Sequence, residues 1–376
     1  MQFVGWGDGH DLVVPSSGTY AGTNVSCSGS SGSTTLTCGG TFTVGDIVLI
    51  YQTRGVGVGT WELNQVVSDN GATLTLLFPL SSTYTDSGNS QAQVIEVKEY
   101  SSGTISGTFT CNAWNQDIGG IIAFCVSGKL TITGTVNAGN GTYTNKGYIQ
   151  GIGQLDALGW RGWSGEGTVG VRVWKGNNDG SDNGSGGAGG IERHDGGGGG
   201  AGGGNGAKGT NGGQPPVADP VAQGGAAAGN AALTNMVFGG GGGGGGRSDT
   251  NAGCQAGAGG GIVVIFAREL VTSAGYIKSG GAAAGGGSGN EGGGGGGAGG
   301  SILIKTITAT LGTNRVLAPG GAGNAGGGTG FAGGAGATGR VRIESCSYTG
   351  SANNPTPSYS TGGHDFCGSV AAVIGG

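Results

Sequence analysis

Charge is scarce in this sequence. Asp, Glu, Lys and Arg make up 10 % of the 376 residues, and 16 basic against 21 acidic side chains give a formal net charge of -5. Proteins that bind DNA or RNA draw much of their affinity from lysine and arginine contacts to phosphates. We therefore expect no nucleic-acid partner.

Long apolar runs and proline are also scarce. No apolar run approaches the roughly 20 residues that span a bilayer as a helix, so we expect no membrane insertion. The 8 prolines, and glycine runs that ignore a three-residue period, exclude a collagen-like chain. Hydrophobic residues nevertheless reach 35 % and gather in short β-branched runs, which argues against a largely disordered chain.

Recognisable catalytic motifs are missing. The sequence has no GxSxG elbow, and the nearest approach to a phosphate-binding loop, residues 206–210, has glycine where Ser or Thr must follow the lysine. Each of the three histidines precedes an aspartate, as in His10-Asp11. Adjacent strand residues face opposite ways, so we interpret these pairs as turn or surface residues. Glu96 and Glu99, three positions apart on a predicted strand, are likewise expected on opposite faces. We predict no catalytic residues and no enzymatic activity.

Glycine, in contrast, is abundant. The chain has 99 glycines, roughly one residue in four, compared with about 7 % in an average protein. Glycine loses more backbone entropy on folding than other residues and has no side chain to bury. So many glycines exclude the predominantly helical fold classes, and we predict an all-β protein.

The glycines divide the chain into three parts. Residues 1–117 contain strand-like runs, such as 46–51 and 73–78, separated by Gly, Asn and Ser turns. This pattern predicts an N-terminal β-sandwich or β-solenoid-like domain rather than βαβ units. A glycine-rich repeat domain follows at 118–345, and residues 346–376 form a C-terminal tail.

The repeat has a fixed period. Apolar strands begin just after Gly261, Gly300 and Gly339, which are separated by two steps of 39 residues. The strand after Gly120 is interpreted as an earlier copy, which makes residues 139–260 an enlarged glycine-rich insertion. Repeats of fixed period stack so that neighbours bury each other's apolar faces, with insertions on one side of the stack.

Glycine tracts such as 196–204, 239–246 and 292–297 fill the gaps in this repeat. We predict that they are ordered as polyglycine II-type helices, in the polyproline II conformation with three residues per turn. Such a helix has no internal hydrogen bonds, but the missing Cβ of glycine lets several of them pack side by side and bond to one another. The alternative is that the tracts are flexible loops on a β-scaffold.

This pattern resembles a known group of proteins. Residues 259–268 (GGGIVVIFAR), 277–282 (IKSGGA) and a long glycine run into 301–304 (SILI) are similar to the glycine-rich repeat proteins of phage tail fibres and of microbial surface adhesins and filaments. The resemblance covers roughly 118–345, and residues 44–50 (VGDIVLI) are similar to domains that precede such repeats. It implies an extracellular or virion-borne location and packed polyglycine helices of the kind found in tail-fibre tip adhesins.

The seven cysteines lack a CxxC motif, which gives little support for a zinc or thioredoxin-type site. Their local spacing suggests disulfides in an oxidising compartment, with buried thiols as the alternative. The candidate pairs are Cys27–Cys38, Cys111–Cys125 and Cys346–Cys367, with Cys254 unpaired.

An aromatic segment is the best candidate for a binding surface. Exposed rings on loops give a large contact area at low entropy cost, as receptor and glycan binding require. The alternative is that the rings are buried over glycine tracts. The candidates are Tyr143, Tyr148, Trp160, Trp163 and Trp174.

Two weaker signals concern ligands and modification. Asp179 and Asp182 lie in an oxygen-rich stretch that could bind calcium, although a solvated loop is the simpler interpretation. No other cofactor is expected. Asn24, Asn140 and Asn183 form Asn-x-Ser/Thr sequons that permit glycosylation.

These features together predict a non-enzymatic, extracellular structural or adhesive protein, a self-associating subunit of a surface fibre or filament. The apolar run at 369–374 could add as a strand to a neighbouring subunit's sheet or complete the chain's own sheet. The first alternative is a phage tail-fibre adhesin that binds a cell-surface or glycan receptor. The second is a carbohydrate-active β-solenoid enzyme, which requires a cluster of carboxylates that the sequence does not indicate.

Overall fold

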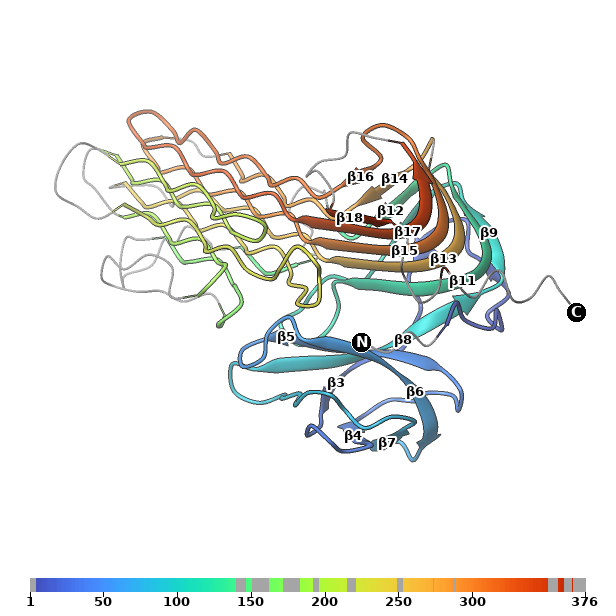
Figure 1. The fold of residues 1–376 in the computed structure, drawn as a ribbon. Helices are drawn as coiled ribbons and strands as arrows, with labels where there is room; N and C mark the ends of the chain where they lie inside the picture. The colour runs from blue at the N-terminus through green and yellow to red at the C-terminus, as the bar shows by residue number, and fades with distance from the viewer. Residues whose placement is uncertain are drawn as a thin grey trace, which may run out of the picture.

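The computed structural model describes residues 5–139, 147–150, 162–171, 183–191, 196–214, 221–248, 253–272, 274–286, 289–350, 358–361 and 367. All the secondary-structure elements defined in these residues are strands, which confirms the all-β prediction. Figure 1 shows three parts: a small barrel, a stack of long strands, and a glycine-rich lobe that extends away from the stack.

The N-terminal strands form a closed six-stranded antiparallel barrel, in place of the expected β-sandwich or β-solenoid-like domain. Its strands are β3 (Asn24–Ser28), β4 (Thr35–Cys38), β5 (Ile47–Arg54), β6 (Trp61–Asp69), β7 (Thr73–Leu76) and β8 (Gln91–Tyr100). They pair in the order β3-β4-β7-β6-β5-β8, and β8 also pairs with β3, which closes the ring. Alternate residues of β5 point into the barrel, such as Val48, and toward the rest of the molecule, such as Leu49, so the whole strand is buried.

The stack consists of two parallel sheets. The first continues from β8 through the long strands β11 (Ile121–Ile132), β13 (Ile262–Thr272), β15 (Ser301–Leu311), β17 (Arg340–Thr349) and the short β18 (Ser358–Thr361). The second contains β2 (Gly18–Thr19), β10 (Thr108–Thr110), β12 (Thr135–Asn137), β14 (Tyr276–Lys278) and β16 (Val316–Leu317). The short β1 (Val13–Val14) pairs with β9 (Ser102–Ile105), which in turn pairs with β11.

The sheet register has the same period as the sequence repeat. Ile262 pairs with Ser301, which pairs with Arg340, so neighbouring strands are one 39-residue period apart. Ile121 pairs with Ile262, so the strand after Gly120 lies next to β13 in the same sheet, and the glycine-rich residues between them follow β12 in the chain. In-register apolar residues then stack on one another; Phe124, Ile265, Ile304 and Ile343 form one such ladder and are fully buried. Each such side chain contributes about 1.5–3 kcal/mol through burial.

The glycine lobe is built from the insertion and from the two later connections of the repeat. We use this name for the described residues within 147–261, 279–300 and 318–339. Their backbone bonds run between segments that are far apart in the sequence. Several chain segments lie side by side along the lobe in Figure 1.

Candidate functional site

Hydrogen bonds between tracts in the glycine lobe follow a three-residue period. Gly197, Gly200 and Gly203 donate their N–H groups to carbonyls of segment 290–296, at 2.8–3.0 Å. The next residue in each triplet donates to segment 185–191, and two of the third residues donate to segment 210–213. One tract is therefore bonded to three neighbours through its N–H groups alone, and it accepts further bonds from other tracts.

The same packing excludes side chains from most positions. A Cβ on Gly200 would meet the carbonyl of Gly243, and a Cβ on Gly243 would meet that of Ala188, both far closer than the 3.0 Å below which real Cβ atoms essentially never approach. Some alanine methyl groups do fit between the tracts. Ala188, Ala201 and Ala222, for example, pack together in one small cluster. The glycines of this lobe are therefore required for close approach of neighbouring backbones.

An aromatic cluster anchors the glycine lobe to the other two parts. Phe238, which directly precedes the 239–246 tract, lies 5.4 Å from the ring of Tyr148, 5.5 Å from Trp114 and 6.0 Å from Tyr51 of β5. The Tyr51 hydroxyl donates to the Met236 carbonyl at 3.0 Å, and the Tyr148 hydroxyl donates to the Thr53 carbonyl. These rings are fully buried and fix the direction in which the tract leaves the scaffold.

A buried ion pair lies beside this cluster. Arg54, at the end of β5, contacts Glu166 of the glycine lobe, and both side chains are at most 3 % exposed. The second oxygen of Glu166 accepts hydrogen bonds from Trp114 Nε1 at 3.0 Å and from the Ile149 N–H at 2.9 Å. Burial raises the pKa of Glu166, against the opposing effects of these donors and of Arg54. The barrel, the stack and the lobe thus meet at one carboxylate.

The predicted binding aromatics have different outcomes. Tyr148 is fully buried, so the burial alternative holds for it and it offers no surface to a receptor. Trp163 is half-buried, and its carbonyl accepts the Gly244 N–H at 2.8 Å, so it borders the 239–246 tract. Three others, Tyr143, Trp160 and Trp174, lie outside the described residues, as do the calcium candidates Asp179 and Asp182.

One of the three predicted disulfides is present. Cys346 and Cys367 are bonded, and Cys254 is a buried thiol, as expected. The predicted disulfides Cys27–Cys38 and Cys111–Cys125 are not formed, because all four residues are buried thiols. Cys27 and Cys38 do lie opposite each other on β3 and β4, where burial raises the pKa of both, that of Cys38 to about 11. Cys111 follows β10 and Cys125 lies in β11, which belong to different sheets. Their closeness in the sequence was therefore a poor guide to pairing.

The three glycosylation candidates differ in their outcomes. Asn183 is 4 % exposed, and its Nδ2 donates to Ser164 Oγ and to the carbonyls of Gly165 and Val171 at 2.8–2.9 Å. A glycan cannot reach this amide in the folded chain. Asn24 is half-buried in β3, with its Oδ1 buried. Asn140 and the apolar run at 369–374 lie outside the described residues.

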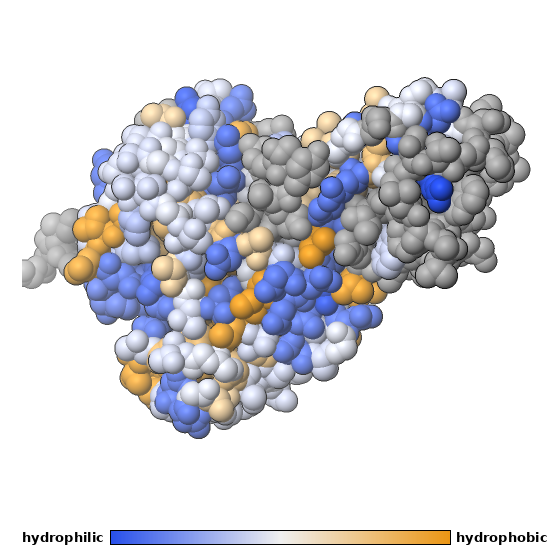
Figure 2. Space-filling view, turned by 180° about the vertical axis from the view of Figure 1, so that it is seen from behind, coloured by the Kyte–Doolittle hydropathy of each residue, from blue (hydrophilic) through white to orange (hydrophobic). Residues whose placement is uncertain are grey.

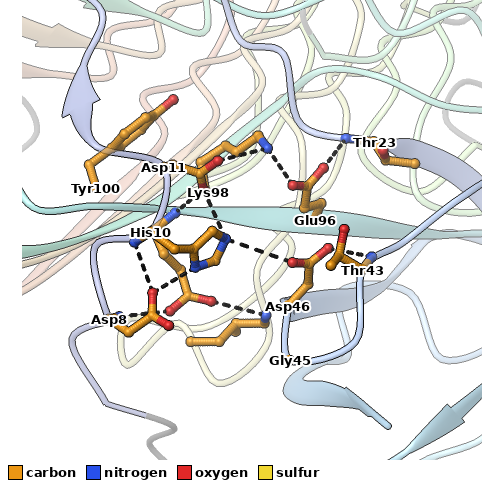
Figure 3. A network of polar contacts seen from close by, with 12 residues as sticks. Asp8, His10, Asp11, Thr23, Thr43, Gly45, Asp46, Glu96, Lys98 and Tyr100 are labelled. Atoms are coloured by element: carbon orange, nitrogen blue, oxygen red, sulfur yellow. Dashed lines mark hydrogen bonds and ion pairs between the residues drawn. The ribbon is translucent and has the colours of Figure 1, made fainter. Parts of the chain in front are cut away.

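The sequence did not predict a polar network where the N-terminal segment lies against the end of β8 (Figure 3). His10 Nδ1 lies 2.6 Å from Asp8 Oδ1, and its Nε2 lies 3.6 Å from Asp11 Oδ2 and 3.8 Å from Asp46 Oδ1. The Asp8 N–H donates to Glu99 of β8 at 3.0 Å. The only signal was the His10-Asp11 dipeptide; a chain reversal, not strand geometry, gathers the acidic groups there.

The electrostatics of this network follow from its geometry. Burial disfavours the imidazolium of His10, but the hydrogen bond to Asp8 and the surrounding carboxylates more than offset it, so the pKa of His10 is raised. The N–H and ring of His10 lower the pKa of Asp8. Burial raises the pKa of Glu99, although the N–H groups of Asp8 and Ile47 oppose it.

The molecular surface is pale over much of the face in Figure 2, and apolar residues form several separate patches there. The large apolar side chains with the greatest exposure include Val56 at 81 % and Leu12 at 73 %. The described residues contain no helix of the length and apolar character that a membrane span needs.

No protein-family model matches the sequence, and the search of curated proteins found no significant match.

Proposed function

We propose that this chain is a non-enzymatic extracellular protein with a structural and adhesive role, the subunit of a surface fibre or filament. The observation that carries the proposal is the glycine lobe, whose interior consists of backbone bonded to backbone. The three-residue period of these bonds is that of the polyproline II conformation. We infer that the tracts are polyglycine II-type helices packed against one another.

Such a lobe suits a mechanical role. Each tract bonds to several neighbours, so bending one tract requires breaking bonds to all of them. The ends are held by the aromatic cluster and by parallel strands in fixed register. The Cys346–Cys367 disulfide supports an extracellular location, since disulfides persist in oxidising compartments.

A phage tail-fibre adhesin is the second candidate. It is favoured by the direction of the glycine lobe, which extends away from both the barrel and the stack in Figure 1. Loops carried at the far end of a rigid scaffold are where receptor-binding surfaces commonly form. A cell-surface or glycan receptor would be the partner in that case.

Electron microscopy of the purified native assembly tests the proposal. Helical filaments with this chain as the repeating subunit would support it, and a virion fibre carrying the chain at its tip would support the second candidate. Monodisperse single particles, with a monomer mass by light scattering over a wide concentration range, would contradict both assembly roles.

A further inference from the structure

Three side chains of the polar network are arranged as a set of metal ligands. One ligand atom each from Asp8, His10 and Glu99 lies within 4.8 Å of the other two. Asp8 and His10 are exposed and Glu99 is buried, so the group lies at the surface and Glu99 is its innermost member. An imidazole with two carboxylates is a donor set that suits Zn²⁺ and related divalent transition metals.

The other side of the imidazole is arranged as the outer shell of such a site. If Nδ1 binds the metal, Nε2 carries the proton and points toward Asp11 Oδ2 and Asp46 Oδ1, at 3.6 and 3.8 Å. Metal-bound histidines commonly donate their second N–H to a carboxylate, which fixes the tautomer and the ring orientation.

The carboxylate of Asp46 is held beside the imidazole by a backbone hydrogen bond. This residue is 5 % exposed, and its Oδ2 accepts the Thr43 N–H at 2.8 Å. Within the described residues no hydrogen bond reaches its Oδ1, which faces the His10 ring from beyond hydrogen-bond distance. The imidazole is the cationic group that Asp46 Oδ1 faces, and a metal on Nδ1 would keep the Nε2 proton directed toward this oxygen.

The charge balance agrees. Lys98 is the only lysine or arginine in this network among the described residues, and it pairs with Asp11 and Glu96. The remaining carboxylates, Asp8, Asp46 and Glu99, lie around the single imidazole. Even with His10 protonated the network carries excess negative charge. A divalent cation would offset it, since buried charges in proteins are paired or bind metals.

We propose that Asp8, His10 and Glu99 bind a divalent transition-metal cation of the Zn²⁺ class, with Asp11 and Asp46 orienting the imidazole. The cation would tie the N-terminal segment to β8 at the point where that strand leaves the barrel and begins to pair with β11. The inference concerns this site alone and does not rest on the proposed fibre role.

Titration of the chelator-treated full-length protein with Zn²⁺, followed by calorimetry, tests the site. We expect one Zn²⁺ per chain, with binding about tenfold or more weaker in His10→Ala and in Asp8→Asn. The matched control is Glu269→Gln, which removes an exposed carboxylate of β13 that pairs with Lys129, and its affinity should equal that of the wild type. Undiminished binding in His10→Ala, or no binding by the wild type, would overturn the proposal.

The Co²⁺ spectrum gives a second readout that needs no variant. Nitrogen and oxygen ligands give weak visible d–d bands, as the site predicts. An intense thiolate-to-cobalt charge-transfer band would assign the metal to the cysteines and would also overturn the proposal. Because Asp8 is exposed, Asp8→Asn keeps the titration decisive even if His10→Ala does not fold.

Discussion

Substitution of a single central glycine tests the packing of the glycine lobe. Gly243 donates its N–H to the Ala201 carbonyl at 2.8 Å, and its carbonyl accepts the Gly295 N–H at 2.9 Å. A Cβ at this position would collide with the carbonyl of Ala188, the group that accepts the Ala201 N–H at 2.9 Å. Gly243→Ala therefore forces apart tracts that share three hydrogen bonds.

The expected loss follows from these three bonds. Relief of the collision requires a shift of about 1 Å, enough to take a bond of normal length beyond its useful range. At about 1 kcal/mol for each bond the loss is about 3 kcal/mol. Replacing glycine by alanine also lowers the entropy of the unfolded chain, which stabilises the folded state by about 0.4–1 kcal/mol. The net destabilisation should be about 2–3 kcal/mol.

Gly286→Ala is the matched control in the same lobe. Gly286 is exposed, and a Cβ there would meet only Asn324 Nδ2, at 4.0 Å. We expect its free energy of unfolding to stay within about 0.5 kcal/mol of the wild type. Urea unfolding followed by circular dichroism compares the two variants. Equal stability of Gly243→Ala and Gly286→Ala would refute the packing argument.

Three further predictions concern the other parts of the molecule. Arg54→Met should lower the free energy of unfolding by about 3–5 kcal/mol, because it leaves the buried Glu166 carboxylate without its ion-pair partner. Adding Glu166→Gln should recover much of this loss. Equal losses in the urea unfolding of the single and the double variant would contradict the prediction. Burial alone would raise the pKa of Glu344, but Lys305 and a neighbouring arginine more than offset it and lower the pKa. The resulting stabilisation is fully present above the ordinary glutamate pKa of 4.5 and is lost as the pH falls through the lowered pKa of Glu344 in the folded state. The stability of Glu344→Gln should therefore depend less on pH in acid. An unchanged pH dependence in urea unfolding would count against this prediction. Cys346→Ser should cost about 3 kcal/mol, an effect that a reducing agent should reproduce in the wild type but not in the variant.

The strand stack was predictable because its determinants are local and periodic. The apolar runs after Gly261, Gly300 and Gly339 recur every 39 residues, and in-register parallel pairing is the way to bury all of them at once. The barrel was harder to predict from the sequence. Its strands could be recognised, but its closure depends on the pairing of β3 with β8, which no local pattern encodes.

The sites were harder to predict than the strands. Tyr148 is in a stretch rich in aromatic residues and glycine that reads as a surface loop, yet its ring packs on Phe238, ninety positions away. The geometry of a strand predicts opposite faces for His10 and Asp11. The chain instead turns there, and carboxylates of the N-terminal segment lie close to Asp46 and Glu99. Both outcomes depend on tertiary contacts between distant residues.

Amide hydrogen exchange across residues 196–204, 239–246 and 292–297 tests most directly whether the glycine tracts form a bonded layer. Nearly every N–H in these tracts donates to a carbonyl of another segment, and the residues are buried. Their amides should therefore exchange far more slowly than those of an unstructured glycine peptide, with protection approaching that of β13 and β15. Exchange at the rates of an unfolded chain in all three tracts would contradict the account and return them to flexible loops on a β-scaffold.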